Sequence, residues 1–109
     1  MLVEQRTEPS VLWRRCRESL GIARLLVNEK RPAPFVETAC HLAVENGCRA
    51  ALALTGRSFD GDVRSALLSL EAPDELLAEP AADLAKAERA VGWLAEHLKN
   101  RIPDRVWGY

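Results

Sequence analysis

Three stretches of the chain carry hydrophobic residues three or four positions apart, the spacing of an amphipathic α-helix. The first runs from Val11 to about Asn28, after an N-cap expected at Ser10. Gly21 lies inside it, where glycine costs about 1 kcal/mol relative to alanine, so we expect another backbone to approach closely there. The apolar stripe of this helix is Leu12, Cys16, Leu20, Ala23 and Val27.

The second stretch, from Phe35 to about Thr55, is apolar around nearly its whole circumference, which is typical of a central helix. A second subunit would help to bury such a helix in a chain of 109 residues, so a two-fold homodimer is predicted. Small residues along it allow another helix to approach closely: Ala39, Ala43, Gly47, Ala50 and Ala51. Its polar residues form one line, spaced for pairing from turn to turn: Glu37, His41, Glu45 and Arg49.

The rest of the chain is predicted to form a short helix, a helical turn and a last helix, joined by loops. Gly56 is a natural helix end, and Asp62 is the expected N-cap of a short helix over residues 63–70. A single helical turn is expected at residues 76–77, and Pro80 is expected to open the last helix. That helix carries a clean apolar stripe: Leu84, Ala87, Val91, Leu94, Leu98 and Ile102.

Four main helices joined by short loops predict an all-α protein, an antiparallel up-and-down four-helix bundle with a short extra helix. The composition agrees, because alanine and leucine are abundant while isoleucine and threonine are rare. We expect a single domain over residues 1–109, with its core at about 11–102. The aromatic tail, residues 103–109, is expected to pack on the body.

The charge and the cysteine content of the chain limit the classes of function and the compartments that we expect. A net charge of -1 supplies no general attraction for nucleic acid, so nonspecific DNA binding is not expected. Three cysteines, an odd number without a CxxC pair, indicate reduced buried thiols and hence a reducing compartment. With no long apolar run and no secretory pattern at the N-terminus, the prediction is a cytoplasmic protein that does not span a membrane.

The motifs of several enzyme classes are absent from the sequence. It contains no GxxxxGK[ST], GxGxxG, GxSxG or HExxH, which removes support for phosphate-loop, dinucleotide, hydrolase-elbow and zinc-protease chemistry. The Glu-x-x-His pairs of a di-iron bundle are missing as well. We therefore expect no metal and no cofactor.

Two groups of polar residues remain as candidates. His41 beside Glu45 is a candidate general base. The favoured interpretation is that His41 is one member of the paired polar residues along this helix. Cys40 and Cys48 lie among aliphatic residues and are expected to be core residues. The other group lies along one edge of the last helix, where cations and an indole can hold a nucleotide or an RNA phosphate: Lys86, Arg89, Trp93, His97 and Arg101. The alternative is that Trp93 broadens the buried face while the cations stay solvated.

The run ACHLAVENGCRAALAL, residues 39–54, resembles the central helix of HEPN domains. The family pattern of small residues around a Glu and a basic residue is met by Ala43, Glu45, Arg49 and Ala50. The order of the helices is also similar over residues 11–102. The resemblance implies an antiparallel helical bundle that dimerises and often pairs with a minimal nucleotidyltransferase in a toxin-antitoxin module.

Some HEPN proteins are ribonucleases, which use an Arg and a His separated by four to six residues near the last helix. Here seven residues lie between Arg89 and His97, and Ala90 follows the arginine. The leading hypothesis is therefore a non-catalytic subunit that binds a nucleotide or a partner protein. The alternatives are a weak metal-independent ribonuclease that uses Arg89 and His97, and a helical scaffold without a small ligand.

Overall fold

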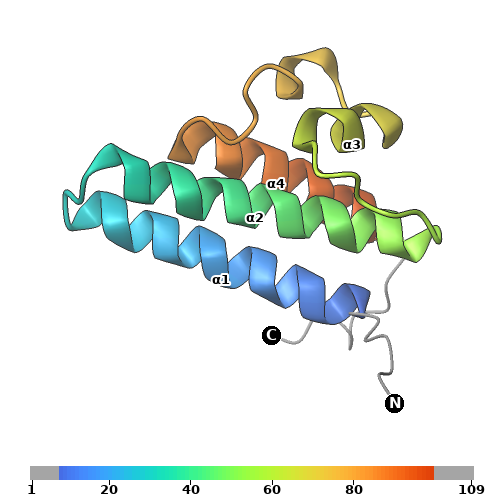
Figure 1. Ribbon diagram of the computed structural model, residues 1–109, viewed down its shortest axis with the longest axis horizontal. Helices are drawn as coiled ribbons and strands as arrows, with labels where there is room; N and C mark the ends of the chain where they lie inside the picture. Colours follow the sequence, from blue (N-terminus) through green and yellow to red (C-terminus); the bar gives the residue numbers. More distant parts are fainter. Residues whose placement is uncertain (1–7, 100–109) are drawn as a thin grey trace.

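The computed structural model describes residues 8–99, and that part of the chain consists of helices, turns and loops without a strand (Figure 1). The expectation of an all-α protein is confirmed. Residues 100–109, which include Arg101, Ile102 and the aromatic tail, lie outside the described residues. The elements are α1 (Pro9–Asn28), α2 (Ala33–Leu54), α3 (Val63–Ser69), the 3₁₀ turn η1 (Asp74–Leu76) and α4 (Leu84–Lys99).

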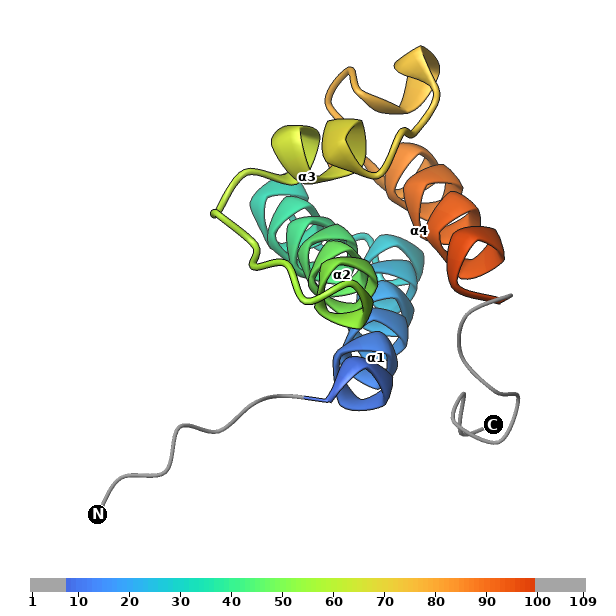
Figure 2. The ribbon, with the colours of Figure 1, turned by 90° about the vertical axis from the view of Figure 1, so that its right-hand side faces the viewer.

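The three long helices lie side by side, with α3 and η1 covering one side of them (Figures 1 and 2). α1 and α2 form an antiparallel hairpin, and α4 runs in the same direction as α2 (Figure 1). The short α3 and η1 carry the chain back between α2 and α4. Of the four main helices that the pattern predicts, three are long and α3 is short. α3 and η1 together connect the end of α2 to the start of α4.

α2 is the central helix, as its all-round apolar pattern predicts, and α1, α3 and α4 all contact it. Other helices approach α2 closely at Gly47. A Cβ built on Gly47 would lie 2.9 Å from Cδ1 of Leu94 on α4 and 3.2 Å from Sγ of Cys16 on α1. The prediction that small residues of α2 admit other helices closely is therefore confirmed. The buried residues of α2 are Ala39, Cys40, Ala43, Val44, Gly47, Cys48, Ala50, Ala51 and Leu52.

At Gly21 the expectation that another backbone approaches the helix closely was wrong. Gly21 is exposed, and nothing lies within 4 Å of a Cβ built there. Val27 was expected on the buried stripe but is 42% exposed. The hairpin of α1 and α2 extends beyond the start of α4, so the last turn of α1 has no third helix beside it (Figure 1).

Local signals account for most helix ends. Gly56 adopts a φ of 73°, and the Arg57 N–H bonds the Leu52 carbonyl at 2.9 Å, which closes α2 as expected. The carboxylate of Asp62 accepts a hydrogen bond from the Ser65 N–H at 3.2 Å and caps α3, also as expected. The turn expected at residues 76–77 is η1, which ends at Leu76.

Two predicted helix starts were wrong. α1 begins at Pro9, with Glu8 rather than Ser10 as the N-cap, because proline is well suited to the first helical position. α4 begins at Leu84 rather than at Pro80. The Oδ1 of Asp83 accepts a hydrogen bond from the Lys86 N–H at 2.8 Å, so the helix starts after this side-chain cap.

Among residues 8–99, no helix combines the length and the apolar character needed to cross a membrane.

Candidate functional site

A cleft of about 450 Å³ lies between α4 and the segment around η1. α4 contributes Arg89 and Trp93, which are four residues apart and therefore share one edge of the helix. The opposite wall is formed by Pro73, Glu75 and Leu76. The cleft thus combines a guanidinium, an indole, a carboxylate and two apolar side chains within one concave surface.

The charged groups of the cleft have no partner among residues 8–99. Neither Arg89 nor Glu75 forms a hydrogen bond or an ion pair with any residue in the described part of the chain. Trp93, in contrast, is partly buried and packs against the hydrophobic core. The indole is therefore held by packing, while the guanidinium and the carboxylate remain available to a ligand.

The edge of α4 continues beyond the cleft to His97. The ring of His97 stacks on that of Trp93, with centroids 5.2 Å apart and an interplanar angle of 24°. Of the four candidates that lie on α4, Arg89, Trp93 and His97 thus occupy one continuous edge, and the fifth, Arg101, lies outside the described residues. The ammonium of Lys86 lies 3.6 Å from the carboxylate of Glu79 and does not line the cleft.

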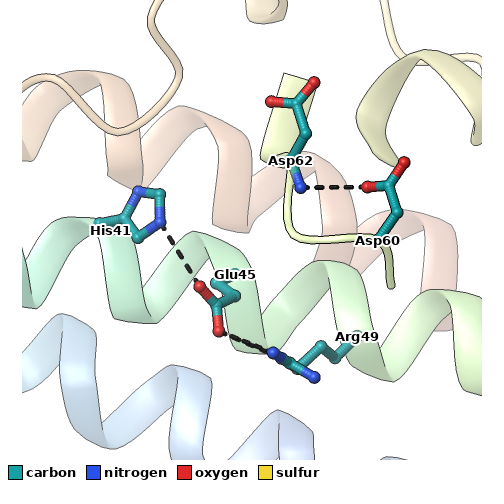
Figure 3. Close-up of polar contacts among 5 residues, drawn as sticks. All are labelled: His41, Glu45, Arg49, Asp60 and Asp62. Atoms are coloured by element: carbon teal, nitrogen blue, oxygen red, sulfur yellow. Dashed lines mark hydrogen bonds and ion pairs between the residues drawn. The ribbon is translucent and has the colours of Figure 1, made fainter. Parts of the chain in front are cut away.

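The polar line on α2 forms a chain of contacts (Figure 3). His41 Nε2 lies 3.4 Å from Glu45 Oε1, and the Arg49 guanidinium donates to Glu45 Oε2 at 3.1 Å. Arg49 also lies over the ring of Phe59, 4.7 Å from its centroid. This contact ties α2 to the loop that leads to α3. The predicted pairing is confirmed for these three polar residues, whereas Glu37 makes no such contact with the residues described.

A second and larger hollow, about 800 Å³, lies between α2, the start of α3 and the turn before α4. His41 lines it, and so does Asp62, the N-cap of α3. Hydrogen bonds from Ser65 lower the pKa of the Asp62 carboxyl, and its backbone N–H donates to Asp60 Oδ1 at 3.0 Å (Figure 3). No pattern in the sequence indicates this groove, because three segments far apart in the chain form it and no residue spacing links them.

The three thiols are core groups, as expected. Cys16, Cys40 and Cys48 are all fully buried. Burial raises the pKa of Cys16 and of Cys48 to about 12, and it raises the pKa of Cys40 as well. Thiols with raised pKa values are poor nucleophiles at neutral pH. Within residues 8–99, no group of three His, Cys, Asp or Glu side chains is arranged to hold a metal ion.

The described residues therefore offer one cleft with an available cation, an aromatic surface and an available carboxylate, and a wider groove beside His41. Comparison of the chain with models of protein families, with curated proteins and with solved structures gives no match.

Proposed function

We propose that this protein is a non-catalytic, HEPN-like helical subunit that binds a nucleotide, free or within single-stranded RNA, in the cleft between α4 and η1. The observation that carries the proposal is the available guanidinium of Arg89 beside the indole of Trp93 in a concave surface. A guanidinium binds phosphate oxygens through charge-assisted hydrogen bonds, and an indole stacks on a nucleobase. Arg89 and Trp93 thus supply one group suited to the phosphate and one suited to the base of a nucleotide.

A binding role fits the residues better than a chemical one. The three thiols are buried with raised pKa values, so none of them is a ready nucleophile. His41 is held by Glu45, which in turn is held by Arg49, as in a structural chain of ion pairs. A ribonuclease that uses Arg89 and His97 is the second candidate, because the two residues flank Trp93 on one edge of α4.

The proposal includes protein partners: a second copy of the chain, and a protein such as a minimal nucleotidyltransferase. Large apolar side chains exposed near the turn between α1 and α2 support a protein contact, since such side chains are commonly covered in assemblies. They are Ile22, Leu25 and Phe35, each more than half exposed. Sedimentation over a range of concentrations tests the homodimer, and a mass near 12 kDa throughout would contradict it.

The nucleotide site is tested by thermal unfolding of the full chain with nucleoside monophosphates and short RNA, with RNA integrity followed in the same samples. A ligand that binds only the folded state raises the melting temperature by mass action. Arg89→Gln should abolish the rise, while Arg14→Gln removes one positive charge from the exposed surface of α1 and should leave it unchanged. If no nucleotide or RNA changes the melting temperature of the unsubstituted protein, the nucleotide site is refuted.

The same samples separate the ribonuclease candidate from the binding role. Cleavage that disappears in His97→Ala, with helicity retained, would establish the ribonuclease and replace the non-catalytic proposal. A rise in melting temperature with intact RNA supports the binding subunit.

A further inference from the structure

We infer that the base bound in this cleft is guanine, so that the ligand is a guanosine carrying one phosphate; this inference rests on the proposed nucleotide-binding function. The observation behind it is the carboxylate of Glu75. Glu75 lines the cleft on the η1 side, Arg89 and Trp93 line it on the α4 side, and Glu75 forms no hydrogen bond or ion pair with the other residues of 8–99. A carboxylate that lines such a cleft can accept hydrogen bonds from a ligand that presents donors.

The chemistry of the carboxylate selects the base. An ionised carboxylate has two oxygen atoms that accept hydrogen bonds and none that donates. Guanine presents two neighbouring donors, N1–H and the N2 amino group, that point in the same direction. The two oxygens of Glu75 match these two donors one to one. Two parallel hydrogen bonds to one charged carboxylate are among the stronger hydrogen-bonded arrangements.

The other bases pair less well with a carboxylate. Adenine and cytosine each place a ring nitrogen acceptor beside the amino group, and uracil places its single N–H between two carbonyl oxygens. Each would bring an acceptor lone pair against an oxygen of Glu75. A site gains specificity from such repulsion as well as from the favourable contacts of the correct ligand.

The cations near the cleft set the number of phosphates. Among residues 8–99, Arg89 is the one cation that lines the cleft, and Lys86 instead lies 3.6 Å from Glu79. One guanidinium suits one phosphate group, as in a nucleoside monophosphate or in one link of an RNA strand. These two sources share the same chemistry and are separated by the ligands used in the test.

The test is calorimetric titration of the full chain with GMP, AMP, CMP and UMP, and with uridine hexanucleotides that contain either one guanosine or none. We expect GMP to bind at least about tenfold more tightly than the other three, the effect of a hydrogen bond to a charged group. Tighter binding of the guanosine-containing hexamer than of GMP identifies RNA as the source, and the reverse order identifies a free nucleotide.

Glu75→Gln supplies the decisive variant. A glutamine amide offers one acceptor and one donor, the complement of the amino group and neighbouring nitrogen of adenine, so the preference should shift from GMP towards AMP. Glu18→Gln removes one negative charge from the exposed surface of α1 and should leave the preference for GMP intact. Glu75→Ala, with helicity checked, should lower the GMP preference to less than about threefold if the donor contacts are lost.

The outcomes separate this inference from the proposed function. Equal binding of the four monophosphates, or a GMP preference that survives both Glu75 substitutions, would overturn the guanine assignment and leave the nucleotide site standing. Failure of every nucleotide and oligomer to bind would overturn both.

Discussion

Gly47 of α2 and Leu94 of α4 occupy adjoining space in the core, so closely that a Cβ on Gly47 would lie 2.9 Å from the Leu94 Cδ1. Leu94 is fully buried, and the Sγ of Cys16 on α1 also lies close, 3.2 Å from the same Cβ position. The three long helices therefore meet where α2 has no side chain. Close packing of this kind leaves little room for a larger residue.

Gly47→Val should destabilise the protein by about 1 to 3 kcal/mol, the usual cost of overpacking a well-packed core. The matched control is Gly21→Val, because Gly21 is also helical but has nothing within 4 Å of its Cβ position. Valine has a somewhat better helix propensity than glycine, so Gly21→Val should be neutral or slightly stabilising. Urea unfolding of both variants makes the comparison, and equal stabilities would contradict the packing described for Gly47.

Lys30, which follows the C-cap of α1, has an unfavourable backbone conformation. Lys30 has a φ of 56°, in the left-handed region, while its N–H bonds the Val27 carbonyl at 3.0 Å. Glycine adopts this conformation without the steric cost that a side chain brings. Lys30→Gly should therefore stabilise the protein by about 0.5 to 1 kcal/mol. Lys30→Ala keeps the Cβ and should show no such gain; a gain of equal size there would assign the effect to the lost charge instead.

The buried thiols predict a loss of stability at alkaline pH. Cys16 and Cys48 have pKa values raised by burial from 9.0 to about 12, so an unfolded chain loses these protons first as the pH rises. Their contribution to stability is complete below pH 9 and is lost as the pH rises from there to about 12. The free energy of unfolding from urea titrations should fall above pH 9, and less steeply in Cys48→Ala. Rapid reaction of the native protein with a thiol reagent at pH 8 would contradict this prediction.

An ion pair joins α1 to α4 across the surface. Arg24 Nε lies 2.7 Å from Glu88 Oε2, and the two side chains are 52% and 41% exposed. Solvent screens such a pair, so a double-mutant cycle with Arg24→Ala and Glu88→Ala should give a coupling energy below about 1 kcal/mol. The coupling should shrink further in 1 M salt, where the Debye length is about 3 Å. A coupling of several kcal/mol, or one that salt leaves unchanged, would refute the assignment of a screened surface pair.

Much of the fold follows from the sequence because its signals are local. The pairs formed by His41, Glu45 and Arg49 depend only on the four-residue spacing within α2, and Asp62 caps a helix that starts at the next residue. The wrong helix starts arose where two local signals compete. Pro80 can open a helix, but Asp83 provides a side-chain cap a few residues later.

The candidate site was predictable only in part. Arg89, Trp93 and His97 share an edge because of helical periodicity, which the sequence displays directly. Glu75 belongs to a different element, and its place opposite Arg89 depends on how η1 packs against α4. No periodic pattern connects residues in separate elements.

The sequence by itself determined the helices, the central role of α2, the buried thiols and the polar line along α2, because each depends on the order of residues within one element. Only the tertiary structure decided which glycine is crowded. Gly21 and Gly47 look alike in a helical pattern, yet α4 lies against one of them and solvent against the other. It likewise decided that Glu75 and Arg89 line the same cleft, since the packing of distant segments depends on the shapes of all the side chains between them.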